Sequence, residues 1–101
     1  MRPQDLVEQL RELNQGLVEP WVLAGARIEK TFLFADFKAA MAFMQRVAEH
    51  AEALDHHPEW RNVYARVEVG LTTHSTGGLS ALDFALAAKM EDEYRLSPAQ
   101  P

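Results

Sequence analysis

The sequence predicts an α+β domain of two layers, in which helices cover one face of a four-stranded antiparallel sheet. The spacing of apolar residues changes from three-and-four to alternation and back, which gives the order helix, two strands, helix, two strands, helix. The 101 residues are also enough for one hydrophobic core but not for two. We expect the domain to span residues 1–96, and residues 97–101, with two prolines, to form a disordered tail.

The first helix and the first two strands are expected in the N-terminal third of the chain. Residues 4–13 carry apolar side chains at helical spacing. They are Leu6, Val7, Leu10 and Leu13. The composition of residues 21–24 and 27–34 is typical of strands, and we expect the two strands to be joined near Ala24–Ala26. One face of the second strand carries Ile28, Lys30, Phe32 and Phe34.

The central helix is expected over residues 36–54. Asp36 is a suitable N-cap, and Pro58 prevents the helix from continuing much past His56. Apolar residues at spacings of three and four predict one broad stripe facing the core. They are Phe37, Ala40, Met41, Met44, Val47, Ala48, Ala51 and Leu54.

Two further strands and a helix complete the prediction. Residues 59–64 and 66–73 are expected to pair as a hairpin, because Val67, Val69 and Leu71 alternate with more polar positions. A loop over residues 75–78 then leads to a helix that begins at Ser80. Asp83, three residues on, forms a capping-box-like pair with it. Leu82, Leu86 and the alanine-rich stretch to Met90 give this helix an apolar side.

The composition argues against several classes of function. The net charge of −5 and the lack of a basic patch argue against direct nucleic-acid binding. Without cysteine, the chain has neither a disulfide nor a thiolate for metal binding or nucleophilic attack. The N-terminal stretch lacks the apolar core of a signal peptide, and no apolar run approaches the roughly 20 residues that cross a bilayer. We therefore expect a cytoplasmic protein that does not bind a membrane.

Two adjacent histidines stand out in the stretch EALDHHPEW, residues 52–60. Glu52 and His56 are four apart, so we expect them to share a helix face, while His57 at the helix end points elsewhere. His74 ends the apolar strand, and Asp83 lies in the first turn of the last helix. We expect these pieces to converge at one end of the two layers.

Such a set of residues suits proton transfer. Histidine titrates near neutrality and serves as a general acid or a general base. A neighbouring carboxylate orients the ring. Simpler roles stay open: the helix dipole favours His56 and His57 at a helix C-terminus, His74 could bond only to its loop, and Asp83 could be only a cap. We expect His50 to be an ordinary surface residue.

A metal site is the rival interpretation. His56, His57, His74 and a carboxylate are suitable zinc ligands by type. However, adjacent residues rarely aim both rings at one ion, and the spacing differs from the paired histidines of the HExxH motif. We therefore do not expect a metal.

The spacing of these residues resembles a known signature. Glu52, His56-His57-Pro58, Tyr64, His74 and Asp83 follow the pattern of the pterin-4a-carbinolamine dehydratases, also known as the dimerisation cofactor of a homeodomain transcription factor. The segments HHPEWRNVY, LTTH and GGLSALD are similar to that family, as are Trp21 and FLFADFKAAMAFM. The resemblance covers roughly residues 6–90. It departs at Pro20, where the family often has glycine.

The resemblance implies a two-layer α+β fold and a hydro-lyase reaction: a 4a-hydroxytetrahydropterin loses water to give a quinonoid dihydropterin, without a metal or redox cofactor. By resemblance, His56 and His74 would be the acid–base groups. His57 would mainly bind the pterin. Glu52 and Asp83 would orient the histidines, and Asp55 would assist. Trp21 is expected in the core.

The family also implies partners. We expect a homodimer or homotetramer, sharing the sheet edge and the last helix, and a functional link to an aromatic amino acid hydroxylase in tetrahydrobiopterin recycling. The alternative function is an interaction protein, a dimerisation cofactor or transcriptional coactivator, that does not need catalysis.

Overall fold

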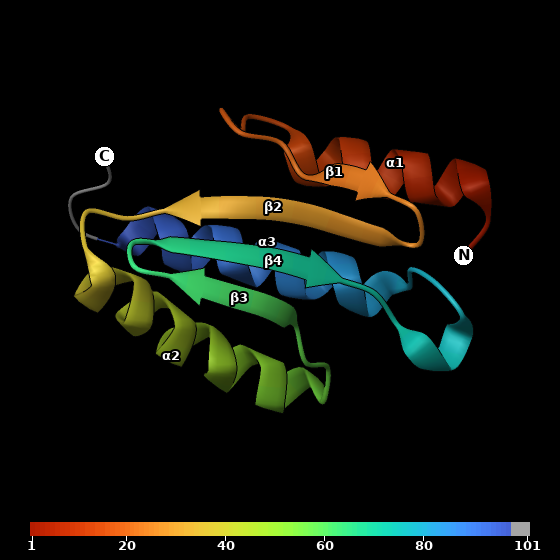
Figure 1. Cartoon of the computed structure of the whole chain (residues 1–101). Coiled ribbons are helices and arrows are strands. Elements are labelled where there is room, and N and C mark those ends of the chain that lie inside the picture. The colour runs from red at the N-terminus through yellow and green to blue at the C-terminus, as the bar shows by residue number, and fades with distance from the viewer. Residues whose placement is uncertain (98–101) are drawn as a thin grey trace.

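The computed structural model describes residues 1–97 and contains three helices, four strands and one short 3₁₀ turn (Figure 1). In chain order the elements are α1 (Pro3–Asn14), β1 (Val22–Ala24), β2 (Arg27–Leu33), α2 (Phe37–Leu54), β3 (Glu59–Val63), β4 (Arg66–Leu71), η1 (His74–Thr76) and α3 (Ala81–Leu96). The strands form one sheet in the order β1-β2-β4-β3, with every neighbouring pair antiparallel. The predicted fold class and order of elements are confirmed.

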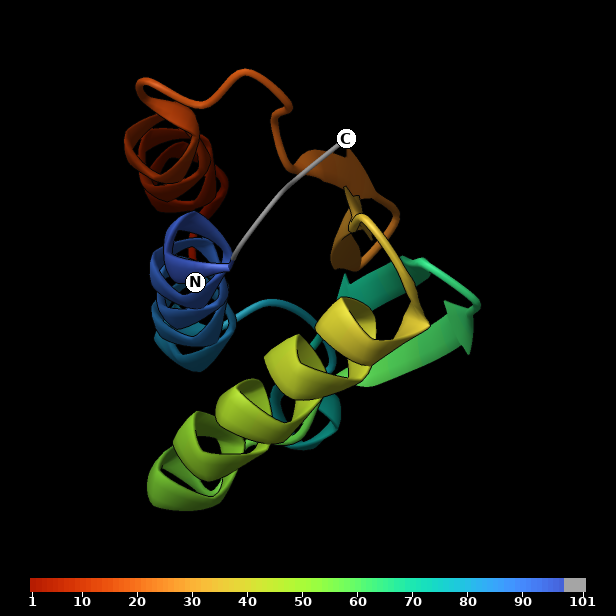
Figure 2. The ribbon, with the colours of Figure 1, turned by 90° about the vertical axis from the view of Figure 1, so that its left-hand side faces the viewer.

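The helices lie on one side of the sheet, as the turned view shows (Figure 2). The register pairs Phe32 with Val67 and Ile28 with Leu71, and all four side chains are buried beneath the helices. The alternate residues of the same strands, which include Arg27 and the residues that follow at every second position, face away from the helices. The sheet therefore has one apolar face and one polar face, as its period of two dictates.

Phe43 lies at the centre of the core, and the sequence analysis did not assign it there. Its ring packs against Phe32, Phe34 and Tyr94, with centroid distances of 5.0, 5.0 and 6.2 Å. Phe43 is 0% exposed, whereas Phe37, which we expected on the apolar stripe, is 47% exposed. The buried stripe of α2 runs through Phe43 and three smaller residues, and Phe37 lies to one side of it in the first turn. The buried members of α2 are Ala40, Phe43, Val47 and Ala51.

The other helices depart from prediction in the same way. Val7 was expected to widen the stripe of α1 but is exposed, and only the leucines of that helix pack against the core. Leu82 was expected on the apolar side of α3 but is more than a third exposed, while Phe84 two residues later is buried. In each helix the buried face lies to one side of the predicted one, because a short apolar pattern fixes the direction of a face only coarsely.

Trp21 is buried, which confirms the expectation that it belongs to the core. Its backbone N–H donates to Asn14 Oδ1 at 2.7 Å, and Asn14 Nδ2 donates to the Trp21 carbonyl at 2.9 Å. The indole N–H donates to Glu91 Oε2 at 3.0 Å, and Lys30 Nζ lies 2.6 Å from the same oxygen. A buried ion pair with additional hydrogen bonds thus ties α1, β2 and α3 together.

A second polar cluster joins α2 to the end of α3. Glu93 accepts a hydrogen bond from Arg46 Nε at 2.9 Å, and its other oxygen lies 2.8 Å from His50 Nε2. Arg46 also donates to Ser97 Oγ at 2.9 Å. His50 is therefore half-buried and paired, and our expectation of an ordinary surface residue was wrong. Ser97, the first residue of the predicted tail, is buried; the rest of that tail lies outside the described residues.

Within residues 1–97, the structure has no helix that is both long enough and apolar enough to cross a membrane.

Candidate active site

The two adjacent histidines lie in the connection between α2 and β3, not on the helix. Asp55 adopts a left-handed conformation with φ of 50°, and the His56 N–H donates to the Ala51 carbonyl at 3.0 Å. This is the Schellman arrangement that ends many helices, with aspartate in place of the usual glycine. The predicted i,i+4 pair of Glu52 and His56 is wrong, because the chain leaves the helix between them.

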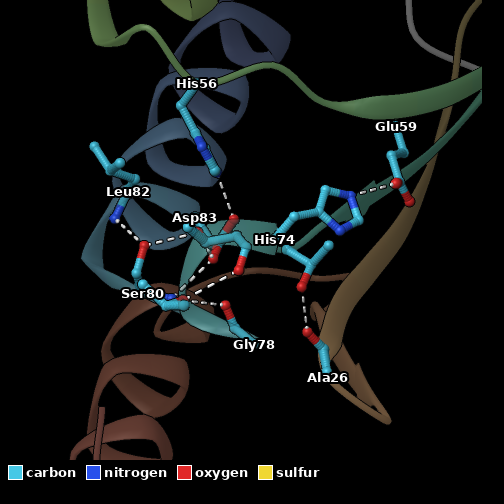
Figure 3. Close-up of polar contacts among 11 residues, drawn as sticks. Ala26, His56, Glu59, His74, Gly78, Ser80, Leu82 and Asp83 are labelled. Atoms are coloured by element: carbon cyan, nitrogen blue, oxygen red, sulfur yellow. Dashed lines mark hydrogen bonds and ion pairs between the residues drawn. The ribbon is translucent and has the colours of Figure 1, made fainter.

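His56 turns inward and pairs with Asp83, the buried carboxylate of α3 (Figure 3). His56 Nε2 lies 2.6 Å from Asp83 Oδ1, and the histidine side chain is only 9% exposed. The other oxygen, Oδ2, accepts hydrogen bonds from Thr73 Oγ1 at 2.8 Å and from the Ser80 N–H at 2.9 Å. A carboxylate only accepts, so the ring proton lies on Nε2 and leaves Nδ1 as an acceptor.

Asp83 therefore combines two roles that the sequence analysis kept as alternatives. It completes a capping box with Ser80 at the start of α3, and it holds the ring of His56. Thr73, which the sequence analysis did not single out, donates to the same carboxylate and lies 2.7 Å from Ser80 Oγ. No pattern in the sequence indicates Thr73, because its partner is ten residues away in another element.

His74 lies on the surface and pairs with a different carboxylate. β4 ends at Leu71, earlier than the expected residue 73, and His74 begins the turn η1. Its side chain is 83% exposed, and its Nε2 lies 3.1 Å from Glu59 Oε2 at the start of β3. The second oxygen of Glu59 accepts from Arg27 Nη1 at 2.6 Å. No role was expected for Glu59 from the sequence.

A pocket of about 310 Å³ opens beside His74. This volume is at the lower end of the range for small-molecule sites, roughly 300–1,000 Å³. The lining residues come from the β1–β2 turn, the start of β3 and the connection between β4 and α3. They are Ala26, Arg27, Glu59, Thr72, His74, Gly77 and Gly78. His56 and His57 are not among them, so His74 is the histidine that this pocket presents directly.

The remaining site candidates are more peripheral. His57 is exposed, and its Nε2 lies 3.3 Å from Glu52 Oε1, so Glu52 supports His57 and not His56. Asp55 is exposed and shapes the backbone before the histidines. Tyr64 lies exposed in the β3–β4 turn, at the opposite end of the strand from Glu59.

The structure thus arranges most of the predicted site residues in three histidine–carboxylate pairs. The pairs of His56 and His74 lie in the same region, as the close-up shows (Figure 3), and the chain links them because Thr73, bonded to Asp83, directly precedes His74. Within residues 1–97, no three histidine, aspartate or glutamate side chains are grouped in a way that would hold a metal ion. Each of the three histidine rings is oriented by a carboxylate, and histidine is a residue type that can act as a general acid or a general base.

Fold and site together define the class: a small two-layer α+β protein that carries oriented histidines beside a small-molecule pocket. Residues 2–93 match the profile of the family described as "Pterin 4 alpha carbinolamine dehydratase". The chain belongs to this family, which confirms the resemblance seen in its sequence.

Individual relatives agree. A protein of Novosphingobium aromaticivorans named "Putative pterin-4-alpha-carbinolamine dehydratase" is 60% identical over 88 residues, covering 85% of this chain and 92% of its own. One of Chelativorans with the same name is 54% identical over 84 residues, covering 79% and 86%.

Two solved structures are similar. One from Brucella melitensis, described as a transcriptional coactivator/pterin dehydratase, has a TM-score of 0.83 at 40% identity and covers 93% of this chain and 97% of its own. A pterin dehydratase-like RuBisCO assembly factor of the alpha-carboxysome has a TM-score of 0.62 at 21% identity, covering 73% and 88%. The second likeness shows the fold alone.

Proposed function

We propose that the protein removes water from a 4a-hydroxytetrahydropterin to give the quinonoid dihydropterin. The observation that carries the proposal is the pair of His56 and Asp83, 2.6 Å apart, in the same region as His74 and its pocket. Membership of the pterin carbinolamine dehydratase family supplies the substrate class.

The reaction needs two proton transfers. The hydroxyl on C4a leaves as water once an acid protonates it, and the proton on N5 leaves as the new C=N bond forms. Atoms and electrons balance with loss of water alone, so the proposed mechanism needs no redox partner. Histidine side chains can act as either general acid or general base, so they suit both transfers.

The geometry supports different roles for the buried His56 and for the exposed His57 and His74. His74, exposed beside the pocket, can reach a ligand without a rearrangement. His56 is held rigidly by Asp83 and exposes little of its ring, so it contributes fixed orientation, the feature that raises acid–base efficiency. His57, exposed and paired with Glu52, is suited to contact the outer part of the pterin. Asp55 assists by setting the turn that separates the two histidines from α2.

The direct test is to follow dehydration of freshly generated 4a-hydroxytetrahydropterin by absorbance, with and without the protein. The uncatalysed reaction supplies the background rate. We expect clear acceleration that is lost in a His56→Ala/His74→Ala double variant. His50→Ala, a histidine outside the site, should keep the acceleration. A folded wild-type protein that binds pterin but gives only the background rate would contradict the proposal.

The proposal also covers the cellular setting of the reaction. We place the reaction in tetrahydrobiopterin recycling in the cytoplasm, linked to an aromatic amino acid hydroxylase, with the protein acting as a homodimer or homotetramer. A second candidate function is that of an interaction protein, because the similar Brucella structure is described as a transcriptional coactivator as well as a dehydratase. A double histidine variant separates the two, since an interaction role does not need these rings.

A further inference from the structure

Three polar side chains from separate elements, Arg27, Glu59 and His74, meet on the polar face of the sheet. Glu59, at the start of β3, places one oxygen 2.6 Å from Arg27 Nη1 and the other 3.1 Å from His74 Nε2. We infer that Glu59 is a positioning residue for His74, and that Arg27 fixes Glu59 for this role. The inference rests on the proposed function, since it assigns to His74 a part in catalysis.

The sheet is built to let Arg27 reach Glu59. Arg27 begins β2 and Glu59 begins β3, and β4 lies between these strands. Gly70 of β4 pairs in register with Glu59 on one side and with Glu29 on the other. The guanidinium of Arg27 crosses the sheet over this glycine. A Cβ at Gly70 would lie 2.6 Å from Arg27 Cζ and closer still to Nη2.

Gly70 therefore has a specific reason to lack a side chain. Glycine inside a strand weakens it and often marks the close approach of another group. Here the group is the Arg27 guanidinium, whose Nε also lies 3.4 Å from Glu29 Oε2. With a carboxylate on each side, the guanidinium is held in one place and offers Nη1 to Glu59.

Glu59 supplies a restraint on the His74 ring that the short turn η1 does not supply. His74 is 83% exposed and sits in a short 3₁₀ turn, so little packing restrains its ring. Glu59, acting as acceptor, selects the ring orientation in which Nε2–H points at the carboxylate. Nδ1 is then the nitrogen left for a substrate. Asp83 orients His56 in the same way. Each of these two histidines therefore has its Nε2 held by one carboxylate.

Other charges on this face do not replace Glu59. Arg61 and Arg66 both contact Glu68, which lies two residues from Gly70 along β4. That second group contacts neither His74 nor the pocket beside it. Glu68 is thus a matched control: a carboxylate on the same face that also pairs with arginine but contacts no histidine.

The experiment compares Glu59→Gln with Glu68→Gln. The first readout is the ¹⁵N NMR shifts of the His74 ring nitrogens, which report the tautomer and need no substrate. We expect Glu59→Gln to change the tautomer balance of His74 and Glu68→Gln to leave it unchanged. Unchanged His74 signals in Glu59→Gln would overturn the inference even if the protein is an active dehydratase.

The second readout is dehydration kinetics. Because exposed ion pairs are weakened by solvent, we expect a fall in kcat of about three- to tenfold for Glu59→Gln, with KM little changed. A loss confined to KM would overturn the positioning role. If the wild type shows no dehydration at all, the proposed function fails, while the NMR comparison still decides whether Glu59 orients His74.

Three further variants test Arg27 without touching Glu59. Gly70→Ala displaces the guanidinium, and Arg27→Ala removes it; both should change the His74 signals in the same direction as Glu59→Gln. Arg27→Lys should restore them in part, because an ammonium supplies the charge but not the reach of the guanidinium. Circular dichroism checks that each variant is folded. If Arg27→Ala folds and leaves His74 unaltered, Arg27 does not fix Glu59.

Discussion

Asp83 and His56 are 27 residues apart in the chain, yet Oδ1 of the aspartate lies 2.6 Å from Nε2 of the histidine. The aspartate is fully buried, and its second oxygen accepts from Thr73 and from the Ser80 backbone. One carboxylate thus starts α3 and orients the histidine beside it. The fold and the site depend on the same group.

We predict that Asp83→Asn lowers both activity and stability. The amide keeps the shape but cannot accept at both atoms, so one buried donor loses its partner, at a cost of about 1–3 kcal/mol in the free energy of unfolding. Loss of a fixed ring tautomer at His56 should lower kcat by roughly tenfold or more. Urea unfolding and dehydration assays measure the two effects.

Ser80→Ala is the control for Asp83→Asn. It removes the hydroxyl that caps the Leu82 N–H but leaves Asp83 in place, so it should cost about 1 kcal/mol of stability and little kcat. If Asp83→Asn and Ser80→Ala had equal effects on kcat, Asp83 would serve only as a cap.

We predict that the three histidines of the site separate by kinetic effect. His56→Ala and His74→Ala should each lower kcat, because each removes a group proposed to move a proton. His57→Ala should raise KM more than it lowers kcat, since His57 is proposed to bind the pterin. Steady-state kinetics on each folded variant measures the split. Full activity in all three would refute the site assignment.

The sequence predicted the order of elements because the change in apolar period is a local property of the chain. It also predicted that His56, His74 and Asp83 converge at one end of the two layers, and the resemblance to a family signature supplied their expected roles. It mispaired Glu52 with His56 because no glycine marks the end of α2. Asp55 takes the left-handed position there. Because glycine, the usual C-terminal signal, is missing, the sequence does not show that the helix ends before His56.

The partners of the histidines were harder to predict than the histidines themselves. Glu59 meets His74 and Arg27 only because β3 and β2 flank β4 in one particular register. In the same region, Thr72 Oγ1 donates to the Ala26 carbonyl, 46 residues away in the chain. The isolated glycine in β4 was the one local signal of a close approach, and it did not identify the approaching group.

We predict that Phe43→Ala severely destabilises the fold. The ring is fully buried among three other aromatic rings, and its removal leaves a cavity, so the loss should be about 3–5 kcal/mol. Phe37→Ala is the matched control, since that ring is about half exposed and should cost much less. Thermal and urea unfolding provide the comparison; similar losses for both would mean that Phe43 is not the centre of the core.

The last prediction concerns Glu93, which joins α2 to α3. The hydrogen bond with His50, helped by Arg46 and opposed by desolvation, holds the pKa of Glu93 below its ordinary value. A carboxyl group with a lowered pKa stabilises the fold above its unfolded-state pKa, and this contribution is lost as pH falls through the folded-state pKa. Glu93→Gln should therefore cost about 1–2 kcal/mol of unfolding free energy at neutral pH.

The pH dependence distinguishes this charge effect from simple packing. The difference between wild type and Glu93→Gln should be complete above about pH 5 and shrink as pH falls below about 4.3, the ordinary glutamate pKa. Asp92→Asn is the control, because Asp92 pairs with Arg95 at the exposed surface of the same helix and should change stability by less than about 0.5 kcal/mol. Urea unfolding at a series of pH values measures both variants. A difference for Glu93→Gln that stayed constant into strong acid would show that the side chain acts through its shape, with no contribution from its charge.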